Sequence, residues 1–343
     1  MFPVSRKSLT AIAIAGALTL TACGGGEGAE GGEATEMRLG HVFGVDSTMH
    51  EAAESFADRV SEETDGRLDI TVFPAGQLGG DEALGQDLSR GTLDFAFLNP
   101  GSLAGMDPLM DFHYLPYIVT DYDQADEIFW GDGVIPTTLS ETLGEQGMTS
   151  LGTFELEFRA VTNNVRPIEG LDDLSGLKLR VPGSAAIRSF FDAAGAQTLV
   201  MPMPELISGL QQNTVDGQDN GVLITTDAGL ADAQEYFTPT RHVYAVGSIV
   251  ISSDVWDGLG EEDQQTVRDI AEDVAAEQVE ENRARVEEYT AALADGDVQV
   301  TELSDAAQQE FREFGLDQWA ALADTYGQDR IDQLRAELDA LGS

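Results

Sequence analysis

Apolar and polar positions repeat with two different periods in the first part of the chain, beginning at Met37. Strand-like runs occupy residues 37–42, 68–73 and 92–98, whereas residues 81–90 and the segment after Ser47 have the spacing of amphipathic helices. Asp46 and Ser47 are expected to form the N-cap of the first helix, because apolar side chains then recur at intervals of three and four (Met49, Ala52, Ala53, Phe56, Val60). This order of elements predicts a parallel sheet with helices on both faces.

The same alternation begins again near residue 149. We expect strands at 149–159, 177–181, 198–201 and 297–301, and helices at 185–194 and 206–212. His242–Ser252 is a longer β-like run, which we expect to cross between two sheets. The stretch from Glu261 to about Leu293 has helical spacing, and at about 1.5 Å per residue such a helix is long enough to contact two domains. Further helices are expected up to the C-terminus.

Length, composition and charge narrow the class of protein. A chain of 343 residues suits two domains of ordinary size, and its 42% hydrophobic content excludes a wholly disordered or collagen-like protein. The chain has 18 basic and 62 acidic residues, which gives a formal net charge of −44. Nucleic acid is excluded as a partner, and an anionic membrane surface is disfavoured, because both require a basic protein surface.

The N-terminal residues have the features of a bacterial export signal. Arg6 and Lys7 precede a weakly apolar run, Leu9–Thr21, which is too short to span a bilayer. Leu20-Thr21-Ala22-Cys23 resembles the lipobox of lipoproteins, so we expect residues 1–22 to be a lipoprotein signal peptide and Cys23 to carry the lipid. An ordinary secretory signal followed by an unrelated cysteine is the alternative. Residues 23–36, rich in Gly and Glu, are expected to tether an extracytoplasmic protein to the cell membrane, on its periplasmic side or at the cell surface.

Signatures of enzymes and of metal sites are scarce. The chain has no nucleophile elbow, phosphate-binding glycine loop or His-Glu-x-x-His pair, and its four histidines lack the spacing of metal ligands. Residues 121–126 resemble a calcium loop superficially, but they lack glycine at the sixth position and are interpreted as a solvated helix start. We therefore predict no catalytic residue, no metal site and no cofactor.

An arginine near the carboxyl end of an expected strand is the strongest candidate for ligand binding. Pro182 keeps Val181 extended, so the chain leaves the sheet directly after Arg180. Ligands of open α/β sheets collect in the crevice at this end of the strands. A guanidinium there binds a carboxylate through two parallel hydrogen bonds, which lysine cannot reproduce. A surface or ion-paired arginine is the alternative in so acidic a chain.

Several motifs follow one another in a familiar order and spacing. The principal ones are Leu177-Lys178-Leu179-Arg180-Val181-Pro182, Met201-Pro202-Met203 and Thr214-Val215-Asp216-Gly217-Gln218-Asp219-Asn220. Together they resemble the solute-binding proteins of TRAP transporters, the dicarboxylate-type family. Phe73-Pro74 with Gly76–Gly80, Gly91–Phe95, and Phe158-Arg159 extend this resemblance over essentially the whole mature chain.

The resemblance implies an α/β fold of the two-domain periplasmic-binding-protein type, a Venus flytrap with crossing strands and a long bridging helix. Domain I is expected to comprise residues 37–157 plus about 246–285, and domain II residues 158–245 plus about 286–343. The two domains are expected to close over an organic anion.

The resemblance also implies ligand-binding roles for individual residues. Arg180 matches the arginine that forms a salt bridge with the ligand carboxylate, and Arg159 matches a second basic position in the cleft. Asn220 matches an asparagine that hydrogen-bonds the ligand, whereas Gln218 and Asp219 are expected to support its turn.

Four further candidates follow from the same resemblance. Asn99 and Met203 match positions that contact ligand from opposite domains. His41 and Phe43 are also candidates for ligand contact, with packing in the core or at the rim as the alternative.

We therefore expect an extracytoplasmic lipoprotein that captures a small organic acid by hinge closure and delivers it to a TRAP membrane permease. Its contact with the membrane is expected through the lipid anchor only. The acid is a dicarboxylate, a sugar acid, a keto acid or an ectoine-like zwitterion. A secreted lyase or hydrolase acting on acidic sugars is one alternative, because the many acidic residues allow a catalytic carboxylate pair. The ligand-binding subunit of a sensor is the other.

Overall fold

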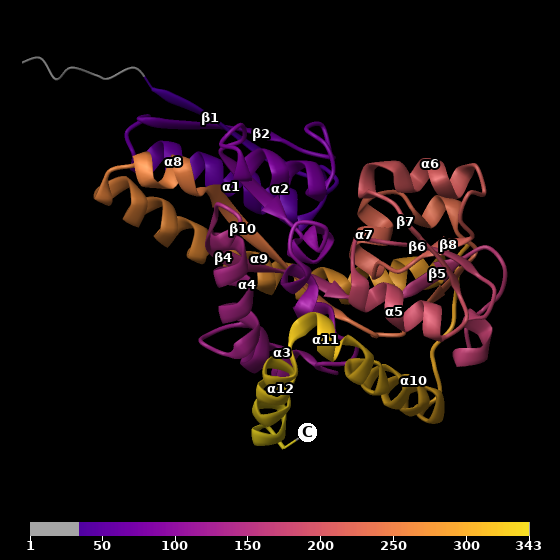
Figure 1. Ribbon diagram of the computed structural model, residues 1–343. Coiled ribbons are helices and arrows are strands. Elements are labelled where there is room, and N and C mark those ends of the chain that lie inside the picture. The colour runs from indigo at the N-terminus through magenta and orange to yellow at the C-terminus, as the bar shows by residue number, and fades with distance from the viewer. Residues whose placement is uncertain (1–33, 343) are drawn as a thin grey trace, which may run out of the picture. The chain divides into compact units, whose positions relative to one another are not determined.

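Two β-sheets organise the chain in the computed structural model, which describes residues 34–342 (Figure 1). These residues belong to one structural unit. The expected signal peptide and Cys23 lie outside the described residues. Among the described residues, no helix is both long and apolar enough to cross a membrane.

The first sheet has five strands in the order β2-β1-β3-β10-β4. β1 pairs in parallel with β2 and β3, as the alternating pattern predicts, whereas β10 enters the sheet antiparallel to β3 and β4. The strands are β1 (Thr35–His41), β2 (Leu68–Phe73), β3 (Phe95–Leu98), β4 (Met148–Phe158) and β10 (Tyr244–Ser252).

Helices of this half begin where the sequence places their caps. The Ser47 side chain accepts a hydrogen bond from the backbone N–H of His50, which confirms it as the N-cap of the first helix. Asp121 caps another helix in the same way, so the calcium-like segment is a helix start. The helices are α1 (Thr48–Glu63), α2 (Asp81–Ser89), α3 (Tyr122–Phe129), α4 (Val134–Glu145) and α8 (Ser253–Gly258).

The second sheet has six short strands in the order β11-β9-β5-β8-β6-β7. β6 lies next to the edge strand β7 and pairs in parallel with both β7 and β8. The strands are β5 (Val161–Asn163), β6 (Lys178–Val181), β7 (Gln197–Val200), β8 (Gly217–Gln218), β9 (Tyr236–Thr238) and β11 (Gln299–Val300). The helices of this half are α5 (Ala185–Ala193), α6 (Leu206–Gln211) and α7 (Val222–Asp227).

The chain passes between the sheets three times: between β4 and β5, between β10 and β11, and, over residues 239–243, between β9 and β10. The expectation that a strand at 242–252 makes this crossing is wrong in detail, because β10 pairs along its whole length within the five-stranded sheet. The crossing falls in residues 239–243, where backbone groups have other partners. The carbonyl oxygen of His242 accepts from Tyr117 N at 2.9 Å, and that of Val243 accepts from Arg159 N at 2.8 Å.

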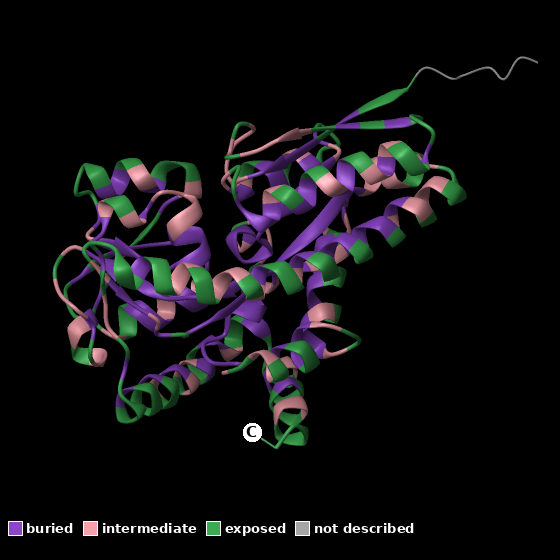
Figure 2. Cartoon of the chain, turned by 180° about the vertical axis from the view of Figure 1, so that it is seen from behind, coloured by how far each residue is buried: buried purple, intermediate pink, exposed green. Residues whose placement is uncertain are grey.

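The long helix α9 (Glu261–Asp295) contacts elements of both halves. It packs against β4 and α1 on one side and against α7 on the other, which confirms its expected bridging position (Figure 1). Buried and exposed residues alternate along it in Figure 2. Two buried polar side chains fix it to β4: Gln278 Nε2 donates to the carbonyl oxygen of Glu155 at 2.9 Å, and Asn282 Nδ2 donates to that of Leu156 at 2.7 Å.

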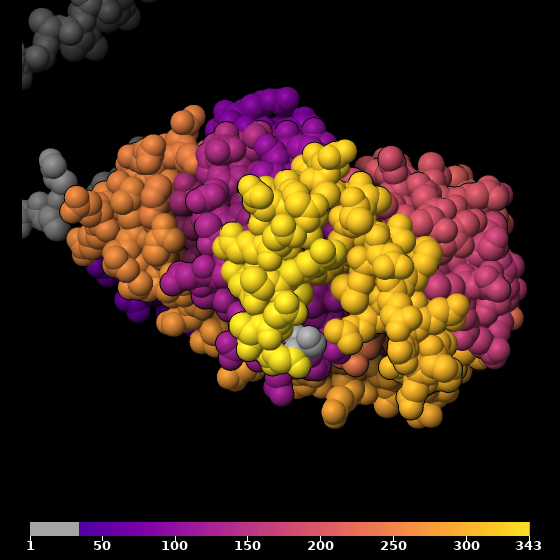
Figure 3. All heavy atoms as spheres, turned by 60° about the horizontal axis from the view of Figure 1, so that its bottom comes forward, coloured from indigo at the N-terminus to yellow at the C-terminus, as the bar shows by residue number. Residues whose placement is uncertain are grey.

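The C-terminal helices also contact both halves. In Figure 3 they cover the face turned toward the viewer. The last helix contacts α4 of the five-stranded half, and the first of the three contacts α5 of the six-stranded half. These helices are α10 (Asp305–Gln318), α11 (Ala323–Tyr326) and α12 (Gln328–Ala340).

Candidate binding site

A cavity lies between segments of the two halves. Its space not occupied by atoms is about 500 Å³, part of it open to solvent. It adjoins the carboxyl ends of β1, β3 and β6, where ligands of open α/β sheets collect. Its walls include Phe43, Asp81, Asn99 and Ser102 from the five-stranded half and Arg180, Met203, Asn220 and Asp227 from the six-stranded half.

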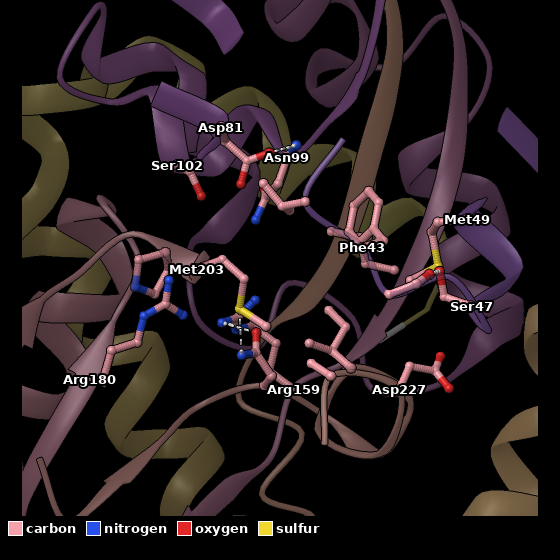
Figure 4. Close-up of a pocket in the computed structure, with 17 residues that line it drawn as sticks. Phe43, Ser47, Met49, Asp81, Asn99, Ser102, Arg159, Arg180, Met203 and Asp227 are labelled. Atoms are coloured by element: carbon pink, nitrogen blue, oxygen red, sulfur yellow. Dashed lines mark hydrogen bonds between the residues drawn. The ribbon is translucent and has the colours of Figure 1, made fainter. Parts of the chain in front are cut away.

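Arg180 lies at the carboxyl half of β6 and lines this cavity (Figure 4). Its side chain is buried, and Nε donates a hydrogen bond to the carbonyl oxygen of Met201 at 2.8 Å. Within residues 34–342 it forms no salt bridge. Burial lowers the pKa of Arg180 to about 10, so the guanidinium stays charged at neutral pH. Asp219, Glu82 and Asp81 lie near enough to act on this charge, but none of them forms a salt bridge with it. The guanidinium is therefore suited to bind an anionic ligand.

Arg159 also reaches the cavity, but it already has a carboxylate partner. Its Nε and Nη2 donate to the two carboxylate oxygens of Asp219 at 2.9 and 2.8 Å. Nη2 also donates to Asn220 Oδ1 at 2.9 Å. Burial alone would raise the pKa of Asp219, but Arg159 and the nearby His242 hold it well below its usual range. The pair is therefore ionised and internally neutral, which leaves Arg180 as the more available cation.

The turn after β8 presents Asn220 to the cavity. The Gln218 side chain accepts a hydrogen bond from Asn220 N at 2.6 Å and donates to Thr162 Oγ1 and Thr225 Oγ1, both at 3.0 Å. With its oxygen bound to Arg159, the Asn220 amide has its nitrogen 3.9 Å from the sulfur of Met203. The structure thus brings Asn220 and Met203 together and places Gln218 and Asp219 beneath them.

Three polar residues lie across the cavity from Arg180: Asp81, Asn99 and Ser102 (Figure 4). Asn99 follows β3, and its side-chain oxygen accepts from Gly101 N at 3.0 Å and from Tyr114 Oη at 2.6 Å. These bonds turn the amide oxygen away from further donors and fix the side chain. Asp81, the first residue of α2, accepts from Asn99 N at 3.1 Å.

Asp81 is the residue of this wall that the sequence analysis missed. It is 5% exposed and forms no salt bridge within the described part of the chain. Burial raises the pKa of Asp81 to about 7. The available signal was its position directly after Gly79-Gly80 at the start of a helix, but a helix-starting aspartate is usually explained by capping alone.

The structure separates the two remaining candidates, Phe43 and His41. Phe43 lines the cavity, whereas His41 lies behind it and is not among the lining residues. His41 Nδ1 accepts from Phe43 N at 3.2 Å, and its Nε2 lies 3.1 Å from His50 Nδ1. Burial lowers the pKa of His41 to about 3, so the imidazole is neutral. His41 therefore supports Phe43 from behind.

The two halves touch each other at the rim of the cavity through positions where only glycine fits. A Cβ atom on Gly44 would lie 2.6 Å from the carbonyl oxygen of Asp227, and one on Gly183 would lie 2.9 Å from that of Ser102. Both distances are shorter than a carbon and an oxygen atom tolerate. The halves are therefore in direct backbone contact on two sides of the cavity.

These features define a two-lobed binding protein of the Venus flytrap type, with a buried arginine facing an interlobe cavity. The family model described as bacterial extracellular solute-binding protein, family 7, matches residues 39–325, and the chain belongs to this family. It is a solute-binding protein of the TRAP type.

Curated and solved relatives agree with this assignment. The chain is 30% identical over 234 residues to the 2,3-diketo-L-gulonate-binding periplasmic protein of Escherichia coli, covering 68% of this chain and 71% of that protein. It is 27% identical over 297 residues to the ectoine-binding periplasmic protein of Halomonas elongata, covering 85% and 86%. The galactonate complex of a sugar acid binding protein from Advenella mimigardefordensis has a TM-score of 0.85 at 28% identity and covers 90% of this chain and 99% of that chain.

Proposed function

We propose that this protein captures a small organic acid outside the cytoplasm and delivers it to a TRAP-type membrane permease. The observation that carries the proposal is Arg180, a buried cation that faces the cavity without a salt-bridge partner among the described residues. The ligand carboxylate binds its guanidinium, with Asn220 beside it. Arg159 contributes through the Arg159–Asp219 pair, and Asn99, Met203 and Phe43 complete the contacts.

Capture proceeds by closure of the two lobes about the crossings and α9. The rim contacts of Gly44 and Gly183 support this proposal, because they are direct contacts between the two lobes of the kind that closure forms. The lobes correspond to residues 37–157 plus about 246–285 and to residues 158–245 plus about 286–343. The permease recognises the closed state, and a lipid on Cys23 keeps the protein at the membrane.

The experiment is a thermal-shift screen of the purified protein against organic acids. The panel contains mono- and dicarboxylates, sugar acids, keto acids and ectoine. A ligand present at 100 times its dissociation constant stabilises the folded state by about 2.7 kcal/mol, enough for a clear shift. Recovery of the bound acid unchanged after prolonged incubation separates a carrier from the alternative lyase or hydrolase. If no organic acid shifts the melting temperature, the proposal is wrong.

A further inference from the structure

The cavity has two polar walls of opposite character, and they face each other. Arg180 lies on one wall, with Asn220 and the Arg159–Asp219 pair near it, and Asp81, Asn99 and Ser102 lie on the other (Figure 4). Between the two walls the lining is apolar, with Phe43, Leu156, Met203 and Ile224. A ligand that spans the cavity therefore meets a cation at one end, carbon and sulfur atoms along its length, and a carboxylate at the other.

The Asp81 carboxylate is available to a ligand. One of its oxygens accepts from Asn99 N at 3.1 Å, and the carboxylate also interacts with the Ser102 hydroxyl. The charge of Arg180 acts on it from across the cavity, but no arginine, lysine or histidine within residues 34–342 forms a salt bridge with it. Ser102 lies beside it and also lines the cavity. A carboxylate, an amide and a hydroxyl side by side offer the acceptors and donors that neighbouring ligand hydroxyl groups need.

From this arrangement we infer that the ligand is a hydroxylated monocarboxylate, and that Asp81 disfavours dicarboxylates in the site. The inference rests on the proposed function, because it assumes that Arg180 holds the ligand carboxylate. A second carboxylate at the far end of the ligand would face the buried Asp81 side chain, and like charges repel more strongly at buried positions than in water. A hydroxyl group at the same place donates a hydrogen bond to Asp81 instead.

The test uses two pairs of acids that differ only in the terminal group. Galactonate and galactarate share six carbons, and erythronate and meso-tartrate share four; in each pair the second acid carries a carboxylate where the first has a CH₂OH group. Isothermal titration calorimetry at pH 8 measures all four with the wild-type protein. We expect the monocarboxylate of at least one pair to bind about tenfold more tightly than its dicarboxylate partner. The dicarboxylate must bind with Asp81 protonated or face its charge, and at pH 8 protonation of a group whose pKa is about 7 costs about a factor of ten.

Asp81→Asn keeps the shape of the side chain and its acceptor oxygen and removes the charge. We expect this variant to lose the discrimination within each pair, chiefly through tighter binding of the dicarboxylate. Asp58→Asn is the matched control: it removes a carboxylate charge from an exposed residue of α1 that does not line the cavity, and it should leave the discrimination unchanged. Equal effects of the two substitutions would overturn the inference, because they would indicate a long-range effect of net charge.

A second measurement uses only the wild-type protein, so it tests the inference even if Asp81→Asn does not fold. Asp81 faces Arg180 across the cavity and Glu82 on its own helix, and its pKa is raised to about 7 by burial. Asp227 also lines the cavity, and burial raises its pKa to about 6. Lowering the pH from 8 to 6.5 therefore protonates most of Asp81 while most of Asp227 stays charged, so galactarate should bind more tightly at pH 6.5 whereas galactonate should not.

The remaining outcomes separate the two claims. If wild-type protein binds the dicarboxylate as tightly as its partner, the inference is wrong and the proposed function stands. If ectoine binds and none of the four acids does, the hydroxylated ligand is wrong and a zwitterion replaces it. If none of the five compounds binds but another acid of the thermal-shift panel does, the inference is wrong and the proposed function stands; if no acid of the panel binds, both fail.

Discussion

Arg159 and Asp219 form a buried ion pair with two parallel hydrogen bonds of 2.9 and 2.8 Å at the edge of the cavity. Both side chains are almost completely inaccessible, so each charge depends on the other for its solvation. His242 Nε2 lies 3.7 Å from the same carboxylate. The pair joins the end of β4 to the turn after β8, and thereby positions Asn220 and leaves Arg180 free to take a ligand carboxylate.

Removal of the Asp219 charge should destabilise the ligand-free protein strongly. Asp219→Asn leaves Arg159 as a buried cation without a carboxylate, and breaking such a pair costs about 3–5 kcal/mol. Urea denaturation at pH 7 measures the free energy of unfolding. Glu277→Gln serves as the control, because it breaks the exposed pair with Arg59, and such pairs contribute about 0–1 kcal/mol. Equal losses in the two variants would contradict the assigned role of Asp219.

Replacement of Gly44 or Gly183 by alanine should weaken ligand binding, because it opposes the contact between the two halves. Gly44→Ala and Gly183→Ala each place a Cβ against a carbonyl oxygen of the opposite half, so the closed arrangement is disfavoured while each half folds as before. We expect affinity to fall by about tenfold, because binding then includes the cost of populating the closed state. Gly105→Ala is the control, since no atom lies within 4 Å of its added Cβ.

Small-angle X-ray scattering provides the structural readout of the same prediction. Saturating ligand should reduce the radius of gyration of the wild-type protein and change that of Gly183→Ala less. An unchanged radius of gyration in the wild-type protein at saturation would argue against hinge closure.

Stability should fall as the pH rises from 5.5 to 8 in the absence of ligand. Burial raises the pKa of Glu157 to about 8, although the side chain accepts hydrogen bonds from Leu223 N and Ile224 N and lies near the Arg159 charge. The folded state therefore retains a proton that the unfolded state releases near pH 4, and this stabilisation is lost as the pH approaches 8. Relative to Glu157→Gln, we expect the wild-type protein to lose about 2–3 kcal/mol over this range. Parallel pH profiles of the two proteins in urea unfolding would show this prediction to be wrong.

Cys23→Ala should release the protein from the membrane without unfolding it. The prediction rests on the Leu20–Cys23 lipobox and on the tether that follows it, which is not expected to contribute to a hydrophobic core. Fractionation of cells that express the two proteins measures the distribution between membrane and soluble fractions. Full retention of the variant in the membrane pellet would show that the anchor lies elsewhere.

The elements that position the site follow from local sequence. The Ser47 cap, the strand that ends at Val181 before Pro182, and the long helix from Glu261 all have signals within a few residues of themselves, and each is found where it was expected. The resemblance to known motifs added the candidates Arg159 and Asn220, both of which line the cavity.

The features that were missed depend on contacts between distant segments. Sixty positions separate Arg159 from Asp219 in the chain, and no spacing rule reveals that the second neutralises the first. Asp81 becomes a wall of the cavity only because the start of α2 packs beside the end of β3. The antiparallel entry of β10 has the same cause: its apolar run is compatible with either direction, and pairing with β4 decides it.

Calorimetry on Arg180 variants tests the central claim most directly. The tightest-binding acid of the thermal-shift panel is titrated into the wild-type protein, Arg180→Lys and Arg180→Ala, with Arg188→Ala as a control for an exposed arginine on α5. Loss of one side of an enclosed charge pair costs about 2–5 kcal/mol, so alanine should weaken binding more than tenfold, with lysine intermediate and Arg188→Ala unchanged. The melting temperature without ligand should change little. If Arg180→Ala strongly lowers the stability of the ligand-free protein while the folded fraction binds the acid normally, Arg180 is a structural residue and the assigned binding site is wrong.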